Sequence, residues 1–294
     1  MPWADLHVGC RSAASLRSLE DLGYSVVCWS SEATGAVPPK PPALVPSPAL
    51  PASSSSSSSF TRPLQQCTRL TLSLEEESHA FALTGAREAL RAYDVVAVAP
   101  ATEPILERVL QSPACEAIDI ICFPAGQRPP FNLRPAMARR LLGAGLHVEL
   151  CYSAALRDSS ARRHFICNLQ AMLEALPKGG KRKISGLIIS SGADEPRLLR
   201  SPRDILALVG AFGCKYELAK LALKDNPFRV LERAARRQTV SPGAPSAVAN
   251  LHAIGPVPSA AAATARLGGK RLSNTASSPG LLSSASGKTK RMRT

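Results

Sequence analysis

The stretch VELCYSAALRDSSARRHF, residues 148–165, decides the fold of this chain. It begins with an apolar run typical of a buried strand, passes through a short loop and ends in the first turn of a helix. Asp158 is the predicted N-cap of that helix, because its side chain can accept a hydrogen bond from a free backbone N–H group. A strand followed so closely by a helix predicts a β/α unit.

The same alternation continues on both sides of this stretch, with apolar strand-like runs separated by segments of helical spacing. Most of the runs are apolar along their whole length, as parallel strands buried on both faces are. The pattern predicts an α/β domain with about seven parallel strands, either a TIM-like barrel or an open sheet. No glycine-rich turn follows an early strand, which disfavours a dinucleotide-binding open sheet. The expected strands are residues 4–8, 24–29, 69–74, 93–98, 118–123, 146–151 and 184–190.

Two segments interrupt or follow this pattern. Residues 31–63 hold eight prolines and a run of seven serines, a composition that cannot bury enough apolar surface to fold, so we predict a disordered insertion in a barrel loop. Residues 238–294 carry seven basic and no acidic side chains and end in KTKRMRT. They are predicted to be a disordered basic tail with a candidate nuclear-import patch. The barrel domain is therefore predicted to span residues 1–30 and 64–237.

The charge of the chain is unevenly distributed along its length. Of the net +14 at pH 7, almost none falls in residues 1–145, whereas residues 146–237 carry 17 basic and 9 acidic side chains. A basic half favours a polyanion partner, because lysines and arginines that neutralise phosphates release counterions. The alternative is that these side chains only keep the surface soluble.

Cysteine usage and hydropathy bear on the compartment. The eight cysteines include no C-x-x-C pair, which argues against a zinc finger or a dithiol redox motif. The sequence opens without a signal peptide, and its apolar runs fall short of the ~18 residues of a membrane span. These observations together predict a reducing, intracellular location.

The first candidate binding group consists of Arg157, Arg162 and Arg163. In a barrel it lies where a strand ends and a helix begins, the face on which barrel proteins build their sites. Free N–H groups and guanidinium forks at such a point suit phosphate. On a helical wheel Arg162 falls on the apolar stripe, so an alternative is that it pairs with an internal carboxylate such as Glu149 and only closes the barrel top. Arg163 falls to one side of the stripe.

The second candidate group follows the seventh expected strand. It comprises Arg197, Arg200 and Arg203, with the hydroxyls of Ser190 and Ser191 as groups that could orient phosphates. In a barrel it would emerge on the same face as the first group. A solvated loop would explain either group alone, but two neighbouring loops of one charge favour a binding site for RNA or a partner protein.

A metal-dependent phosphoesterase is the alternative function. Asp5 with His7, and His147 with Glu149, each place two potential ligands on one strand face, since side chains alternate along a strand. However, the chain has only five histidines, and no third cluster completes a two-metal site. Phosphate-loop and G-x-S-x-G motifs are absent.

The order of several short fragments resembles a known family. The fragments are GYSVV (23–27), LT (70–71), YDVVAV (93–98), TE (102–103), IDI (118–120), YS (152–153), RDS (157–159), RR (162–163) and IISS (188–191). In this order they are similar to the barrel-fold, roughly thirty-kilodalton protein subunit of nuclear and archaeal ribonuclease P, also found in RNase MRP. The resemblance covers residues 3–30 and 66–237.

This resemblance implies an irregular TIM barrel, related to the metal-dependent phosphoesterase (PHP) barrels but without their metal site. It implies a non-catalytic subunit with no cofactor of its own, because in the family the RNA, with Mg²⁺, cleaves 5′ leaders from precursor tRNA. The expected partners are ribonuclease P and MRP RNA, precursor tRNA, and other protein subunits including a small α/β protein. The expected location is the nucleus and nucleolus, with a further role in rRNA processing.

Three features depart from the family pattern. The first helix looks short between Val8 and Leu22, so the first strand–helix unit is expected to be truncated or misassigned. The proline- and serine-rich segment expands the second loop. Glu195 stands before Pro196 where relatives often have a basic residue, which predicts a weaker hold on RNA by that loop.

Overall fold

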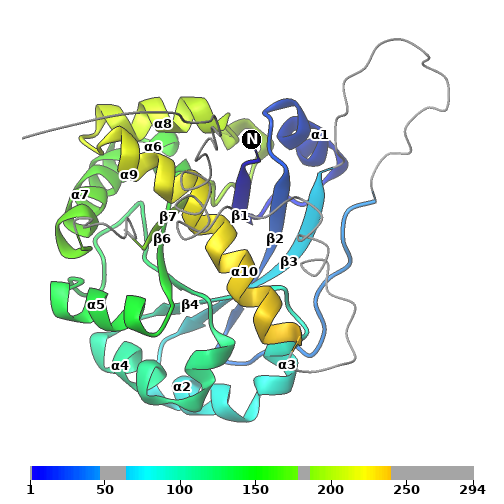
Figure 1. Ribbon diagram of the computed structural model, residues 1–294, viewed down its shortest axis with the longest axis vertical. Helices are drawn as coiled ribbons and strands as arrows, with labels where there is room; N and C mark the ends of the chain where they lie inside the picture. Colours follow the sequence, from blue (N-terminus) through cyan, green and yellow to red (C-terminus); the bar gives the residue numbers. More distant parts are fainter. Residues whose placement is uncertain (1, 47–63, 178–185, 240–294) are drawn as a thin grey trace, which may run out of the picture. The chain divides into compact units, whose positions relative to one another are not determined.

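A computed structural model describes residues 2–46, 64–177 and 186–239. Seven strands form one parallel sheet in the order of the sequence, which curls into a barrel with helices on its outside (Figure 1). This is the TIM-like α/β architecture that the sequence predicts. The strands are β1 (Ala4–Val8), β2 (Val26–Thr34), β3 (Gln65–Leu74), β4 (Val95–Pro100), β5 (Ile120–Cys122), β6 (His147–Cys151) and β7 (Leu187–Ser190).

The helices follow the expected pattern with two differences. The predicted loop after β6 is a short helix, α6, and the first strand–helix unit is complete, because α1 has nine residues and is capped by Ser12. Asp158 is the N-cap of α7, as predicted, and accepts a hydrogen bond from the Ala161 N–H at 2.8 Å. The helices are α1 (Ala13–Asp21), α2 (Glu77–Gly85), α3 (Arg87–Arg91), α4 (Glu103–Gln111), α5 (Pro135–Gly143), α6 (Ser153–Arg157), α7 (Ser159–Ala175), α8 (Pro202–Ala211), α9 (Tyr216–Lys220) and α10 (Asn226–Thr239).

The barrel closes between β1 and the residues that directly follow β7. Val8 and Ala193 form an isolated parallel bridge, and the Gly192 N–H donates to the His7 carbonyl at 2.8 Å. Gly192 has a φ of +56°, and a Cβ there would lie 2.5 Å from the Cβ of Cys151. Only glycine therefore fits this closing turn.

Alternation along the strands separates an outer apolar layer from a partly polar interior. Leu70, Leu72 and Leu74 of β3 belong to the hydrophobic core between the sheet and the surrounding helices. Arg69 and Thr71 alternate with these leucines and so point into the barrel, and both are buried. A fully buried arginine inside a barrel requires a partner of opposite charge.

The predicted boundary of the barrel domain at residue 30 is wrong. β2 runs on to Thr34 and pairs with β3 along nine residues of each strand. Residues 35–46 then lie along the molecule where a helix would otherwise connect the two strands. The prediction of disorder for residues 31–63 is therefore wrong for 31–46, and its remainder, 47–63, lies outside the described residues.

Side chains from the sheet fix this proline-rich segment in place. The Gln66 side chain binds both backbone groups of Val45, accepting from its N–H at 3.1 Å and donating to its carbonyl at 2.8 Å. The same Gln66 Oε1 accepts from the buried Trp29 indole at 2.7 Å, and the Tyr93 hydroxyl donates to the Lys40 carbonyl at 3.1 Å. Hydrogen bonds from side chains thus replace the contacts that an amphipathic helix would make.

Helix α10 crosses the end of the barrel at which the strands begin (Figure 1). It follows α9 through a π-helical segment, Leu221–Asp225. Its polar side chains bind groups that precede or open strands β4 to β7. The bonds, of 2.7 to 3.0 Å, join Arg237 to the Asp94 carbonyl and the Asp119 carboxylate, Arg233 to the Ala144 carbonyl, and Asn226 to the Leu187 carbonyl.

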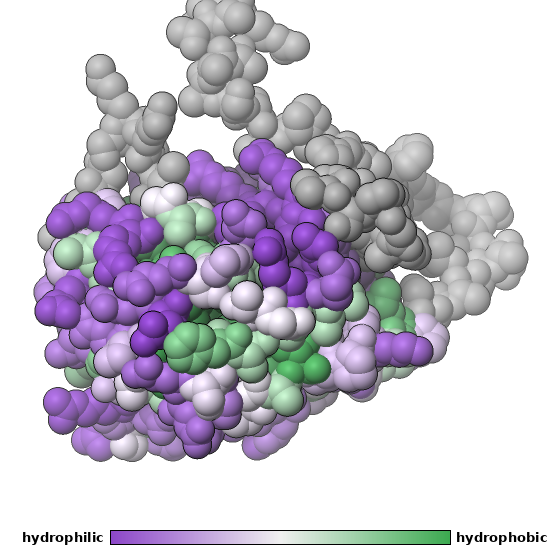
Figure 2. All heavy atoms as spheres, turned by 90° about the horizontal axis from the view of Figure 1, so that it is seen from below, coloured by the Kyte–Doolittle hydropathy of each residue, from purple (hydrophilic) through white to green (hydrophobic). Residues whose placement is uncertain are grey.

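One face of the molecule is drawn in Figure 2 and is mostly hydrophilic. Figure 2 looks at the side of the molecule that carries α2, α3 and α4, and shows polar side chains with smaller apolar groups between them. Phe81 of α2 is 58% exposed, and the Arg108 guanidinium lies over its ring at 4.8 Å. In the part of the chain that the structure describes, no helix is long and apolar enough to cross a membrane. Of the predicted tail, residues 238–294, the first two residues belong to α10, and residues 240–294 lie outside this part.

Candidate functional site

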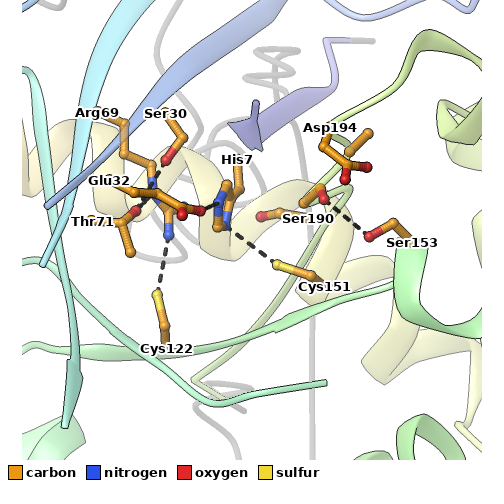
Figure 3. Close-up of polar contacts among 12 residues, drawn as sticks. His7, Ser30, Glu32, Arg69, Thr71, Cys122, Cys151, Ser153, Ser190 and Asp194 are labelled. Atoms are coloured by element: carbon orange, nitrogen blue, oxygen red, sulfur yellow. Dashed lines mark hydrogen bonds and ion pairs between the residues drawn. The ribbon is translucent and has the colours of Figure 1, made fainter. Parts of the chain in front are cut away.

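Buried polar side chains form a network inside the barrel, near the ends at which the strands terminate (Figure 3). At its centre Arg69 of β3 donates to Glu149 of β6, with Nη1–Oε1 at 2.7 Å and Nη2–Oε2 at 2.5 Å. Both side chains are completely buried. Arg69 also donates to the Leu6 carbonyl at 2.8 Å and to the Thr71 hydroxyl at 3.0 Å. The guanidinium is therefore held by three strands at once.

The ion pair controls the protonation of its members. Burial alone raises the pKa of Glu149, but the Arg69 guanidinium, together with His7, holds that pKa well below its usual range. The Ser190 hydroxyl donates to Glu149 Oε1 at 2.6 Å, which further favours the charged carboxylate. A carboxylate so stabilised is a poor general base, because it has little tendency to take up a proton.

On the other side of Glu149, His7 of β1 approaches the carboxylate and a cysteine. Its Nδ1 lies 3.1 Å from Glu149 Oε2 and 3.3 Å from the Cys151 sulfur. Its Nε2 lies 4.0 Å from a carboxylate oxygen of Glu32, which is 80% exposed. The Cys122 thiol donates to Glu149 Oε2 at 3.3 Å. Burial raises the pKa of both thiols well above the usual range, so both are neutral.

The four ligands of the alternative phosphoesterase hypothesis do not come together. Asp5 Oδ1 accepts from the Ser191 N–H at 3.1 Å, and Glu149 is committed to Arg69. His147 lies at the opposite end of the barrel, beneath α10, where burial and nearby arginines lower its pKa to about 4. A two-metal phosphoesterase needs its ligands around one point, so these four residues do not build such a centre.

The first arginine group lies on the surface at the start of α7. Arg157 pairs with Asp194, Nη2–Oδ1 2.6 Å, with the two side chains 44% and 55% exposed. Arg162 is exposed, and its Nε donates to the Ala155 carbonyl of α6 at 2.8 Å. The expectation that Arg162 lies on the apolar stripe is wrong. Arg163 is exposed as predicted, and no hydrogen bond to it is found among the described residues.

The pairing considered for Arg162 is also wrong, because its proposed partner is taken. Glu149 lies inside the barrel and binds Arg69, whereas Arg162 remains on the surface. The sequence around Glu149 and around Arg162 does not indicate that Arg69 is the partner of Glu149. The pattern that could have identified Arg69 is its alternation with the leucines of β3. This alternation places the Arg69 guanidinium on the inner face of the barrel.

In the second arginine group Arg197 and Arg203 are exposed and Arg200 is half-buried, whereas both serines are buried. Arg197 forms an ion pair with Glu195, two residues earlier, and Arg203 is exposed. The Ser191 hydroxyl is buried and donates to the His7 carbonyl at 2.8 Å. Ser190, bonded to Glu149, is buried as well. Both hydroxyls therefore form hydrogen bonds inside the barrel, which corrects the expectation that they face a phosphate.

Arg200 completes the second group and folds back on its own loop. Its Nη1 donates to the carbonyls of Arg197 and Leu199, at 2.7 Å each, and its backbone N–H donates to the Tyr152 hydroxyl at 3.0 Å. The Arg157–Asp194 pair joins this loop to the end of α6. The structure thus brings the two predicted arginine groups to one rim of the barrel, with the serines beneath it.

These features define a parallel α/β barrel whose strand ends enclose a neutralised ion pair and whose rim carries arginines. The family model described as RNase P subunit p30 matches residues 5–239, which include all of the barrel strands except Ala4, the first residue of β1. The chain belongs to this family, as the order of the sequence fragments predicts.

Individual relatives match the same part of the chain. The mouse ribonuclease P protein subunit p30 is 30% identical over 181 residues, which cover 61% of this chain and 63% of the mouse protein. The Arabidopsis thaliana protein GAMETOPHYTE DEFECTIVE 1 is 29% identical over 180 residues, covering 60% of this chain and 29% of that protein. The Saccharomyces cerevisiae ribonuclease P/MRP protein subunit RPP1 is 26% identical over 185 residues, covering 61% and 59%. The chain thus spans less than two thirds of each of these relatives.

A solved structure shares the fold. A chain of a cryo-EM structure of archaeal ribonuclease P with mature tRNA superposes with a TM-score of 0.53 and 10% sequence identity. The alignment covers 82% of this chain and 93% of the archaeal chain. At this identity the likeness concerns the barrel fold alone.

Proposed function

We propose that this chain is a protein subunit of ribonuclease P and of RNase MRP. In that role it supports the RNA-catalysed removal of 5′ leaders from precursor tRNA, and it takes part in rRNA processing. The observation that carries the proposal is the family match over residues 5–239. The names of the mouse and yeast relatives, which are ribonuclease P and ribonuclease P/MRP subunits, support it.

The interior of the barrel supports a non-catalytic role. The buried carboxylate of Glu149 is paired with Arg69 and Ser190, which makes it a poor general base. In this proposal the protein brings no cofactor, and the Mg²⁺ that the reaction requires is bound by the RNA subunit. The protein acts by folding and positioning RNA.

The arginines of the rim are the proposed contacts with RNA phosphate. Arg163 and Arg203 are exposed, and guanidinium groups suit phosphate oxygens. Arg157 and Arg197 have acidic neighbours, but exposed ion pairs contribute only about 0–1 kcal/mol and so can give way to phosphate. Arg162 and Arg200 lie on the same rim and complete the surface, which we call the arginine rim.

We further propose that the chain works in the nucleus and nucleolus with other protein subunits, including a small α/β partner, and with precursor tRNA. The basic sequence KTKRMRT at residues 288–294 supports the nuclear location, since clusters of this kind serve as import signals. Fluorescence microscopy of the tagged full chain, and of a variant with residues 288–294 replaced by a neutral sequence, tests this part. Loss of nuclear signal in the variant is the expected result.

The central experiment is purification of the tagged full chain from nuclear extract, followed by sequencing of the bound RNA. We expect enrichment of ribonuclease P and MRP RNA, with activity on precursor tRNA in the purified complex. Ultraviolet crosslinking in the same cells shows whether the chain itself contacts RNA. If the other protein subunits copurify but the chain forms no crosslink to RNA, its role is that of a protein scaffold and not of an RNA contact. Absence of both RNAs and of the other subunits would contradict the proposal.

A further inference from the structure

We infer that the surface that binds RNA phosphate extends from the arginine rim to a third loop, with Arg128 as a further contact and Asn168 as the residue that positions it. The loop comprises residues 123–134, between β5 and α5. The inference rests on the proposed function, because it concerns the same end of the barrel and the same ligand.

The order of the strands places this loop beside the arginine rim. Strands β5, β6 and β7 are parallel neighbours in the sheet, so the segments that follow them emerge side by side at one end of the barrel. The packing agrees with this order. A Cβ at Gly126 would lie 3.3 Å from the Cβ atoms of both Ala154, in α6, and Ala161, in α7. The loop therefore lies directly against the helices that carry the first arginine group.

Two phenylalanines close the loop at its base. The rings of Phe123 and Phe131 pack edge to face, with their centroids 5.3 Å apart. Phe123 and Ala125 are buried in the hydrophobic core. Pro129 restricts the backbone of Arg128, the residue before it, to extended conformations. The loop is thus ordered by its own residues, and the backbone that carries Arg128 has a fixed place.

Asn168 of α7 holds the loop from beneath. Its side chain is buried, and its amide donates to the carbonyls of Pro124 and Gln127 at 2.9 Å each and to that of Ala125 at 3.3 Å. A side-chain amide has two N–H groups, so the three carbonyls share them. These bonds fix the backbone directly before Arg128. Asn168 itself stays beneath the surface and acts on a ligand only through Arg128.

The charge of Arg128 is available to an external anion. The side chain is exposed, and in residues 2–46, 64–177 and 186–239 no hydrogen bond or ion pair to it is found. Arg157 and Arg197 of the arginine rim, by contrast, each have an acidic neighbour. A guanidinium on an ordered backbone can bind phosphate without breaking an ion pair and without first ordering the loop. Arg128 resembles Arg163 in these respects.

Acidic side chains at the same end of the barrel indicate which side of it faces RNA. Glu32, near the end of β2, is 80% exposed, and Glu75 and Glu76, which follow β3, are exposed as well. Strands β2 and β3 are separated from β5, β6 and β7 by β4 on one side and by β1 on the other. Carboxylates repel phosphate. RNA should therefore lie across the segments that follow β5, β6 and β7.

Filter binding of the purified full chain to ribonuclease P RNA, at several salt concentrations, tests the contact. Arg128→Ala should reduce the slope of log affinity against log salt by about one. The advantage of the parent chain over this variant should then shrink about threefold between about 50 and about 200 mM salt. Arg128→Lys keeps the charge and should keep most of the slope. Arg139→Ala, which removes an exposed charge on α5, is the matched control and should bind like the parent chain.

The variant Asn168→Ala tests the positioning role. It should increase hydrogen exchange in residues 123–134 and lower RNA affinity about as far as Arg128→Ala does. Adding Arg128→Ala to Asn168→Ala should then change affinity little, because both substitutions act through one contact. An Asn168→Ala chain that exchanges faster but binds RNA like the parent chain would overturn the positioning role. Circular dichroism establishes that each variant is folded, and Arg128→Ala decides the contact even if Asn168→Ala does not fold.

The outcomes separate this inference from the proposed function. If Arg163→Ala weakens binding but Arg128→Ala binds like the parent chain, the third loop is not part of the RNA surface, whereas the proposed function stands. If neither variant changes affinity or slope, the inference fails together with the RNA-contact role of the arginine rim. If Arg128→Ala binds RNA normally but loses another protein subunit during purification, the loop docks a protein and the inference is overturned.

Discussion

The Arg69 guanidinium and the Glu149 carboxylate form a two-pronged ion pair inside the barrel, although 80 residues separate them in the sequence. The pair links β3 to β6 across the interior. Both charges are fully buried, so each depends on the other for its stabilisation. Substitutions at these two positions should consequently act as a unit.

Replacing Arg69 by methionine should lower the free energy of unfolding by about 3–5 kcal/mol, because Glu149 would be left buried without its counter-charge. Urea denaturation followed by circular dichroism measures the change. The double variant Arg69→Met/Glu149→Leu removes both charges and should recover most of the loss. A double variant as unstable as the sum of the two single variants would show that the residues act independently.

Stability should fall as the pH is lowered from 7 to 5, through His147. Burial, with the nearby charges of Arg229 and Arg233, lowers the pKa of His147 from 6.5 to about 4. Between these values the unfolded chain binds a proton that the folded chain does not, so acid favours unfolding. The full effect, complete near pH 4, amounts to about 3 kcal/mol. Urea midpoints at pH 7 and pH 5 measure it.

The variant His147→Gln separates this effect from that of the buried carboxyl groups. Its stability should change less between pH 7 and pH 5 than that of the parent chain, whatever its stability at pH 7. An unchanged pH dependence in His147→Gln would assign the acid sensitivity to other groups.

Loss of Arg237 should open the end of the barrel that α10 covers. Arg237 donates to the buried carboxylate of Asp119 at 2.9 Å, and its removal leaves that carboxylate with the Val96 N–H, at 3.0 Å, and the more distant guanidinium of Arg233, at 3.6 Å. We expect Arg237→Met to cost about 3 kcal/mol of unfolding free energy. Arg236→Met, one residue earlier and 82% exposed, is the control and should cost no more than about 0.5 kcal/mol. Equal effects would mean that helix propensity, and not the buried pair, sets the contribution of α10.

The arginine rim should contribute to RNA affinity through phosphate contacts. Arg163→Ala should weaken binding to ribonuclease P RNA and reduce the slope of log affinity against log salt by about one. Filter binding at several salt concentrations measures both quantities. Arg139→Ala, which removes an exposed charge on α5, is the charge-matched control. If neither Arg163→Ala nor Arg162→Ala changes affinity or slope, the phosphate role of this group is wrong.

Local features of the sequence predict the elements well. Thr102 and Asp158 are both recognisable as N-caps, and both accept the expected backbone hydrogen bond three residues on. The strands follow from apolar runs ended by proline or glycine. These signals are local because the hydrogen bonds that decide them join residues close in sequence.

The rotation of α7 could not be predicted from its apolar residues alone. Asn168 is buried too, and its amide donates to the carbonyls of Pro124 and Gln127. With Asn168, Ala161 and Ala175 among the buried residues, the centre of the buried face lies about 90° from Arg162, at 100° per residue. A stripe of large apolar residues does not indicate these three, so it places Arg162 on the wrong face.

The candidate site was predicted only in part, for a related reason. The exposed arginines could be placed at the rim from the order of strands and helices. The partner of Glu149, by contrast, depends on which inward residue of a distant strand reaches it, and the sequence around Glu149 does not indicate Arg69. Contacts across a barrel interior depend on register and closure, which a single sequence does not specify.

Helix α10 has a consequence for how the protein is made. The arginines and the asparagine that bind the beginnings of β4 to β7 belong to the last described element, so they leave the ribosome after every strand has been synthesised. Until then the carboxylate of Asp119 and the carbonyls at that end have no partner from α10. We therefore expect this end of the nascent barrel to stay uncovered until residue 237 has emerged.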